Sequence, residues 1–136
     1  MNRFPLKIVT PDGVRFDDFA QSLKVRTTSG DVTILDRHAN YVAPLGMGEA
    51  VITADGEKRY GACIGGMVSV MDGAVMLVPT TFEWAKDIDV SRAEASEQRA
   101  KQAMEKENTS DLELRLAEAR LKRALIRKSV ANRWQE

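Results

Sequence analysis

Few residues of this 136-residue chain have the types and spacing that catalysis needs. His38 is the only histidine and Cys63 the only cysteine, which excludes a histidine-ligated metal cluster, a multi-cysteine metal site and an internal disulfide. The sequence also lacks a GxxxxGK[ST] phosphate loop, a GxGxxG turn after a strand and the HExxH zinc motif. We therefore predict that the chain is not an enzyme by itself, has no catalytic or metal-ligating residues and requires no cofactor.

The residues that most resemble catalytic groups have structural explanations. His38 is predicted to be a loop histidine near a partner surface. Cys63, within the small and apolar segment YGACIGG, is predicted to be a buried and inert thiol. The pair Gly65-Gly66 precedes a strand rather than a helix, so it indicates a close-packed bend and not a phosphate-binding loop.

The clearest candidates for ligand binding are arginines in the last third of the chain. Two pairs have spacings of seven and four residues, which place the members of each pair on one helix face: Arg92 with Arg99, and Arg123 with Arg127. Guanidinium groups hold phosphate oxygens through two parallel hydrogen bonds, so each pair can converge on one anion. A nearby carboxylate such as Glu83 or Asp89 can accept hydrogen bonds from donor groups of the same ligand.

The same residues also have a structural alternative. Asp89 is suited to cap a helix, and the arginines can form surface ion pairs with neighbouring acids, namely Glu94, Glu97 or Glu118. The segment 115–133 nevertheless contains only one acidic residue, Glu118, and seven basic ones: Arg115, Arg120, Lys122, Arg123, Arg127, Lys128 and Arg133. Such a basic helix is either a solvated surface or a docking element for acidic partners.

The overall composition restricts the class of protein. Twenty basic and twenty acidic residues give a formal net charge of zero, whereas nucleic-acid binding needs clustered excess positive charge. No apolar run approaches the ~18 residues that cross a bilayer, and the N-terminal segment lacks the apolar core of a secretory signal. We expect a reduced, soluble protein on the cytoplasmic side, without nucleic-acid partners.

The distribution of residue types divides the chain near residues 85–89. All nine glycines and all four prolines lie before residue 80, and Ala, Glu, Lys and Arg dominate after residue 88. Residues 1–87 carry nine basic and eleven acidic side chains, whereas residues 88–136 carry eleven basic and nine acidic ones. The predicted domains are therefore 1–87 and 88–136.

The first domain is predicted to consist of short strands. In residues 22–28, apolar and polar side chains alternate with the period of a half-buried strand. Asp55-Gly56 and Asp72-Gly73 each separate two apolar runs, which is the signal of a tight β-hairpin. Strands and turns at this spacing favour a β-sandwich or a flattened barrel.

The second domain is predicted to be an αα-hairpin. Asp89 is suited to cap a first helix that extends to about Lys106, and Ser110 with Glu113 forms a capping box for a second helix. The second helix has two partly apolar faces, one with Leu114, Ala117, Leu121, Ala124 and Leu125, and the other with Leu112, Leu116, Val130 and Trp134. A helix with two such faces needs more than one partner.

The whole chain resembles the epsilon-subunit family of bacterial ATP synthases. The resemblance rests on segments in the same order along the chain: LKIVTPDGVRFDD, SGDVTILDRHANYVAPL, CIGGMVSVMDGAVMLV, DIDVSRAEASEQRA and LKRALIRKSV. It implies an α+β protein, with an N-terminal antiparallel β-sandwich followed by a C-terminal antiparallel αα-hairpin. It also implies a non-catalytic rotor subunit of the central stalk, which couples proton-driven rotation of the ring to ATP synthesis.

The resemblance further implies partners. The β-sandwich would touch the gamma subunit and the polar loops of the c-ring, with Asp31 and His38 at those contacts. The alternative is that Asp31 only caps its own turn and His38 only satisfies a local carbonyl. The hairpin would fold down against the sandwich, or extend along gamma toward the alpha and beta subunits and inhibit ATP hydrolysis. Only the complex would hold the chain at the cell membrane, peripherally and on its cytoplasmic face.

Regulatory ATP binding is implied as well. The segment IDVSRA at 88–93 matches the family's nucleotide-binding segment, and Arg123 and Arg127 match second-helix arginines of its nucleotide-binding members. The resulting ATP site consists of Glu83, Asp89, Arg92, Arg99, Arg123 and Arg127. The sequence departs from the family in the loop before His38, where Asp36-Arg37 replaces the usual Pro-Gly.

Two other classes of function stay open at this point. One is a free-standing β-sandwich adaptor whose helical hairpin recruits an unrelated partner. The other is a small enzyme that uses His38 or Cys63. Co-purification distinguishes the three classes. Large ATPase subunits would favour the rotor subunit, and a single unrelated partner would favour the adaptor. Turnover of a substrate by the isolated chain would favour the enzyme.

Overall fold

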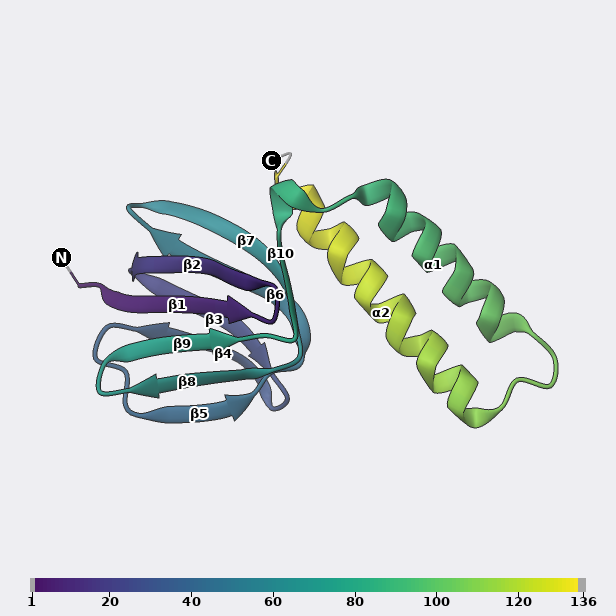
Figure 1. Cartoon of the computed structure of the whole chain (residues 1–136), viewed down its shortest axis with the longest axis horizontal. Helices are drawn as coiled ribbons and strands as arrows, with labels where there is room; N and C mark the ends of the chain where they lie inside the picture. The colour runs from purple at the N-terminus through teal and green to yellow at the C-terminus, as the bar shows by residue number, and fades with distance from the viewer. Residues whose placement is uncertain (1, 135–136) are drawn as a thin grey trace. The chain divides into compact units, whose positions relative to one another are not determined.

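The computed structural model describes residues 2–134, which form two compact units that divide between Trp84 and Ala85. Within those residues, ten strands make up the first unit and two long helices the second (Figure 1). The β-sandwich and the helical hairpin predicted from the sequence are confirmed. Neighbouring strands pair antiparallel, apart from β1 and β9, which pair parallel.

The sandwich consists of two five-stranded sheets. The first sheet has the order β2 (Gly13–Ala20), β1 (Phe4–Thr10), β9 (Ala74–Val78), β8 (Met67–Met71) and β5 (Tyr41–Pro44). The second has the order β10 (Thr81–Trp84), β7 (Glu57–Ile64), β6 (Met47–Ala54), β3 (Ser22–Thr27) and β4 (Gly30–Leu35). Figure 1 shows the two sheets as facing layers.

Alternate side chains of both sheets form the core between the layers. Phe4, Leu6 and Ile8 of β1 are buried, and the residues between them point outward. Asp55 and Gly56, between β6 and β7, both have positive φ, at 52° and 78°. This is the conformation that a two-residue type I′ hairpin needs, and the predicted Asp-Gly turn is confirmed.

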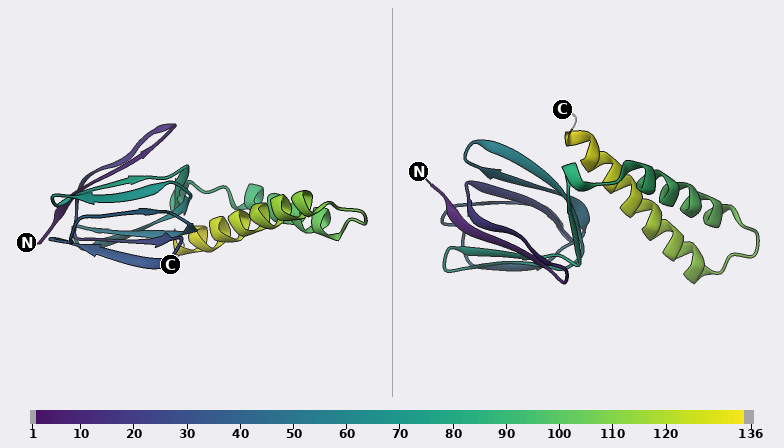
Figure 2. Two further views of the ribbon diagram at one scale, coloured as in Figure 1. Left: turned by 90° about the horizontal axis from the view of Figure 1, so that it is seen from below. Right: turned by 45° about the horizontal axis from the view of Figure 1, so that its top comes forward.

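The second unit begins with the 3-10 turn η1 (Ala85–Asp87), which is followed by α1 (Val90–Glu105) and α2 (Asp111–Trp134). The two helices lie side by side and antiparallel in both views of Figure 2. Asp89 Oδ1 accepts a hydrogen bond from the Arg92 amide at 3.0 Å, and Ser110 Oγ accepts one from the Glu113 amide at 3.1 Å. Both predicted N-caps are therefore confirmed.

Small side chains dominate the contact between the helices. The buried apolar residues of α1 are Ala93 and Ala100, and those of α2 are Ala117, Ala124, Val130 and Ala131. An alanine methyl contributes only about 0.8 kcal/mol when it is buried. The predicted faces of α2 were wrong at two positions: Leu125 is 46% exposed, and Val130 is 1% exposed. The buried residues of α2 extend to Val130 and Ala131, and this helix packs against η1 as well as α1.

One charged residue lies within this contact. The Glu97 side chain is 8% exposed, and its two carboxylate oxygens each receive an ammonium group at 2.8 Å, one from Lys101 on the same helix and one from Lys128 on α2. We call this group the Glu97 clasp. Hydrogen bonds from Lys101 and then Lys128 lower the pKa of Glu97 to about 2, against the opposing effect of its burial.

The clasp predicts how the hairpin responds to acid. The pKa of Glu97 lies below its ordinary value of 4.5. The stabilisation of the helix contact by the clasp is therefore complete above about pH 4.5 and is lost as the pH falls toward 2. Lys128 also interacts with Glu94, and its contact with Glu97 raises the pKa of Lys128, so this lysine stays charged throughout the range. We expect NMR signals of α1 and α2 to show loss of the helix contact between about pH 4 and 2. A Glu97→Gln variant should not show this pH-dependent loss of the helix contact. The same loss in the variant would show that protonation of Glu97 is not its cause.

Candidate functional site

Asp31 lies at the beginning of β4, directly opposite Arg26 of β3. The Arg26 guanidinium donates from Nε to Asp31 Oδ1 at 2.7 Å and from Nη2 to Oδ2 at 3.3 Å. This hydrogen bonding holds the pKa of Asp31 below its ordinary value. Thr27, rather than Asp31, closes the turn, because its hydroxyl donates to the Gly30 carbonyl at 2.8 Å and accepts from the Ser29 amide at 3.1 Å. The alternative that Asp31 caps its own turn is therefore wrong.

His38 lies in the loop between β4 and β5, at the other end of β4 from Asp31. Its Nδ1 is 2.7 Å from the Ala39 carbonyl, and its ring meets the edge of Tyr41 with centroids 5.7 Å apart. Arg37 has a φ of 66°, the left-handed conformation that glycine adopts readily. The structure thus does not bring Asp31 and His38 together, because they lie at opposite ends of β4.

An uncovered apolar surface lies on the outer side of the first sheet. We call it the apolar sheet face, and it consists of Val42, Pro44, Met67, Met71, Met76 and Val78. The strand register places Pro44, Met67 and Val78 in one row and Val42, Ser69 and Met76 in the next. A hollow of about 420 Å³ opens where β1, β8 and β9 meet on this side. A continuous surface of this kind is typical of a protein contact.

The apolar sheet face was not predicted from the sequence, although the sequence contains a signal for it. The runs MVSVM at 67–71 and AVMLV at 74–78 are apolar on both alternating sets of positions. Such runs indicate strands that are covered on both faces. In this chain one face of β8 and β9 is buried in the core, and the other is exposed.

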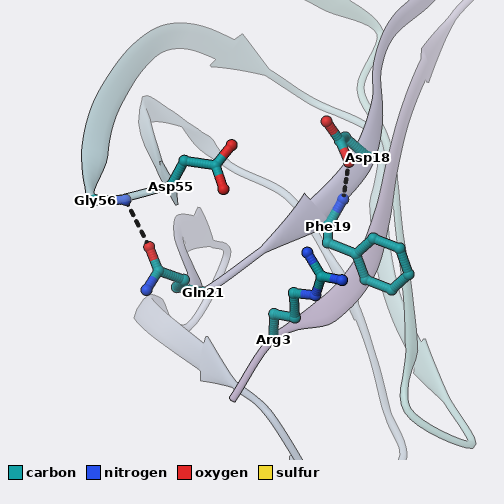
Figure 3. A pocket seen from close by; sticks show the side chains of 6 residues that line it. All are labelled: Arg3, Asp18, Phe19, Gln21, Asp55 and Gly56. Atoms are coloured by element: carbon teal, nitrogen blue, oxygen red, sulfur yellow. Dashed lines mark hydrogen bonds between the residues drawn. The ribbon is translucent and has the colours of Figure 1, made fainter. Parts of the chain in front are cut away.

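A second hollow, of about 440 Å³, lies at one end of the sandwich (Figure 3). The Arg3 guanidinium lies 4.4 Å from the centre of the Phe19 ring, and Gln21 Oε1 accepts a hydrogen bond from the Gly56 amide at 2.8 Å. Asp18 Oδ1 accepts one from the Phe19 amide at 2.7 Å. Most polar groups of this hollow therefore serve contacts within the chain. Among the described residues, no group of three or more His, Cys, Asp and Glu side chains could hold a metal ion.

Cys63 and the Gly65-Gly66 pair have the structural roles predicted for them. Cys63 is 4% exposed, and burial raises the pKa of its thiol to about 12, so it forms almost no reactive thiolate. Gly65 and Gly66 have φ angles of 69° and 96°, and a Cβ at Gly66 would overlap the Val78 carbonyl. Only glycine fits this bend.

The residues of the predicted ATP site come from both units. Glu83 lies half-buried in β10 of the sandwich, and the other five residues belong to the hairpin unit. Asp89 caps α1, as described above. The Glu97–Lys128 contact places Arg99 and Arg127 at about the same level of the hairpin. Arg92 is nearer its open end.

The arginines are spread along the hairpin rather than gathered at one point. Arg92 and Arg99 are two turns apart on α1, or about 10 Å, and Arg123 and Arg127 are one turn apart on α2, or about 6 Å. Within residues 2–134, the side chains of Arg92, Arg99 and Arg123 are exposed and form no ion pair with the acids considered above. This arrangement suits an elongated anion with several charged groups.

None of the helices within the described residues has the length and apolar character that crossing a membrane requires. Residues 3–85 match the family model of the ATP synthase delta/epsilon chain β-sandwich domain, and residues 86–132 match that of its long α-helix domain. The chain is 44% identical over 131 residues to the ATP synthase epsilon chain of Ruminococcus albus, which covers 96% of this chain and 97% of that protein.

Two solved assemblies contain chains of similar fold. A chain in the cryo-EM structure of Euglena gracilis mitochondrial ATP synthase, OSCP/F1/c-ring, has a TM-score of 0.82 at 18% identity, with 93% of this chain and 80% of that chain covered. A chain in the Tetrahymena thermophila mitochondrial ATP synthase central stalk and c-ring has a TM-score of 0.64 at 12% identity, with 93% and 95% covered. At these identities the likeness concerns the fold alone.

Proposed function

Because the chain belongs to the ATP synthase delta/epsilon chain family, we propose that it couples rotation of the c-ring to ATP synthesis and inhibits ATP hydrolysis through its helical hairpin. It is a non-catalytic subunit of ATP synthase and no enzyme by itself. In this proposal the sandwich binds the gamma subunit and the polar loops of the c-ring, and the hairpin reaches the alpha and beta subunits when it extends. The complex holds it peripherally on the cytoplasmic face of the membrane.

The apolar sheet face is the observation that carries the proposed contact with gamma. Its methionines and valines are well exposed in the isolated chain: Val78 is the least exposed, at 41%, and Val42 the most, at 59%. A rotor subunit must transmit torque without slipping, which calls for a wide and dry contact. The sandwich offers such a surface on β5, β8 and β9, beside the loop that carries His38.

Purification from native membranes tests this proposal. We expect the tagged chain to co-purify with the large ATPase subunits and with their ATPase activity. Met76→Glu, which puts a charge into the apolar sheet face, should abolish that co-purification, because an unpaired charge would be buried in the contact. Leu35→Glu, at a 56% exposed leucine of the other sheet, is the matched control. Capture of one unrelated partner instead would favour a free-standing adaptor.

The proposed c-ring contact leads to a prediction at Asp31. Asp31→Arg should reduce coupled ATP synthesis about twofold or more, because it reverses a charge at the interface and leaves Arg26 without its partner. The fold should persist, since an exposed ion pair contributes little to stability. Glu57→Arg makes the same charge change at the opposite end of that sheet, as the register of β3, β6 and β7 indicates. Equal synthesis rates for both variants in reconstituted vesicles would remove Asp31 from the interface.

The hairpin supports the proposed inhibition and the proposed ATP binding. Its second helix has an excess of basic side chains, which suits docking on acidic segments of other subunits. Its exposed arginines on α1 and α2 suit a triphosphate. ATP that binds the folded-down form better than the extended form shifts the population toward the folded-down form, and so relieves inhibition.

A further inference from the structure

We propose that the Glu97 clasp is the switch element that keeps the two helices of the hairpin together, so that breaking it separates α1 from α2. The clasp spans the helices through one contact, from Lys128 Nζ to Glu97 Oε1 at 2.8 Å. Its other ion pair, from Lys101 to Glu97, remains within α1. Only the Lys128 arm therefore depends on whether the hairpin is closed.

The apolar part of the contact between α1 and α2 is weak, so the clasp contributes a large share of the stability of the closed hairpin. Glu97 occupies the middle of a row of small side chains on α1, between Ala93 and Ala100. A carboxylate at that position is favourable only with its cations in place, because a buried charge without a partner is costly. In the closed hairpin the Glu97 side chain is 8% exposed and both of its oxygens are engaged.

Separation of the helices uncovers the faces through which they pack. Most of the stability of a helix in a protein comes from packing of such a face, so an open hairpin needs new partners for its uncovered faces. On α2 the face that separation uncovers carries Ala117, Ala124, Val130 and Ala131, whereas Leu112, Leu116 and Trp134 are 49–67% exposed even in the closed hairpin. The clasp thus sets how readily α2 becomes available to other subunits. This consequence rests on the proposed inhibitory function, whereas the clasp itself does not.

A distance measurement within the hairpin tests the proposal on the full chain. Spin labels at Ser91→Cys and Asn132→Cys, two exposed positions near the open end, report whether the helices are together. The buried Cys63 does not compete for the label. We expect Lys128→Met to raise the fraction of long distances about fivefold. The matched control is Lys101→Met, which removes an ion pair within α1 and should change that fraction less than about twofold.

The dependence on salt provides a second readout. A rise from about 0.05 to 0.5 M salt should open the unaltered hairpin, because it weakens the charge contact. Glu97→Ala removes the clasp altogether, so its fraction of long distances should be the same at both salt concentrations. Circular dichroism checks that every variant keeps its helices.

The outcomes are distinct. An unchanged distance in Lys128→Met, or equal opening in Lys128→Met and Lys101→Met, overturns the proposed role of the clasp. Opening in Lys128→Met alone supports it. If that variant opens but ATP hydrolysis by the reconstituted complex stays the same, the clasp stands and the proposed inhibition fails.

Discussion

Truncation after residue 87 is expected to raise ATP hydrolysis by the assembled complex about five- to tenfold, which corresponds to about 1–1.4 kcal/mol of preference for the inhibited form. The truncated chain keeps the sandwich, which has its own core and forms a separate compact unit. It should therefore still assemble and support rotation. The measurement is the hydrolysis rate of complexes reconstituted with the truncated and the full chain.

A second truncation separates the roles of the two helices. Ending the chain after Lys106 removes the basic helix α2 and leaves α1. If the cations of α2 cause the inhibition, both truncations should raise hydrolysis equally. A hydrolysis rate that stays at the full-chain level after both truncations would show that the hairpin is not an inhibitor in this complex.

The isolated chain is expected to bind ATP, and Arg92→Ala, Arg123→Ala and Arg127→Ala should each weaken binding about tenfold or more, since a hydrogen bond between charged groups contributes about 1.5–3 kcal/mol. Arg99 is expected to contribute to the same site. Isothermal calorimetry of the isolated chain measures the affinity of each variant.

Arg115→Ala is the matched control for this series. Arg115 is an exposed arginine of the same helix, two turns from Arg123 and outside the proposed site. Its removal changes the net charge equally but should leave the affinity within about twofold. No heat of binding at millimolar ATP, or equal affinity in all variants, would exclude the site.

The fold could be predicted largely because local signals agreed with the tertiary structure. The alternation in β3, the Asp55-Gly56 turn and the two helix caps each depend on residues close together in the sequence. The burial pattern of α2 could not be predicted in the same way. Val130 is buried in a helix that packs against η1 as well as α1, and helical periodicity carries no information about which elements a helix contacts.

The candidate sites illustrate the same limit for charged residues. From the sequence, Glu97 was considered only as a partner of arginines, but in the structure both of its oxygens contact lysines. The Lys128 contact joins residues 31 apart and requires the hairpin register to be known. Arg26 and Asp31 are closer, yet their pairing also follows from the β3–β4 register. Charge alone does not identify a partner when many acids and bases are present.

The apolar sheet face has a consequence for the supply of this subunit in the cell. A copy that is made in excess of its complex carries Met67, Met71 and Met76 into solvent, with no neighbour to cover them. The side chains that would complete an interface then form an adhesive surface, which promotes self-association and engagement by chaperones or proteases. Balanced production with its partner subunits is therefore a requirement that these three methionines impose.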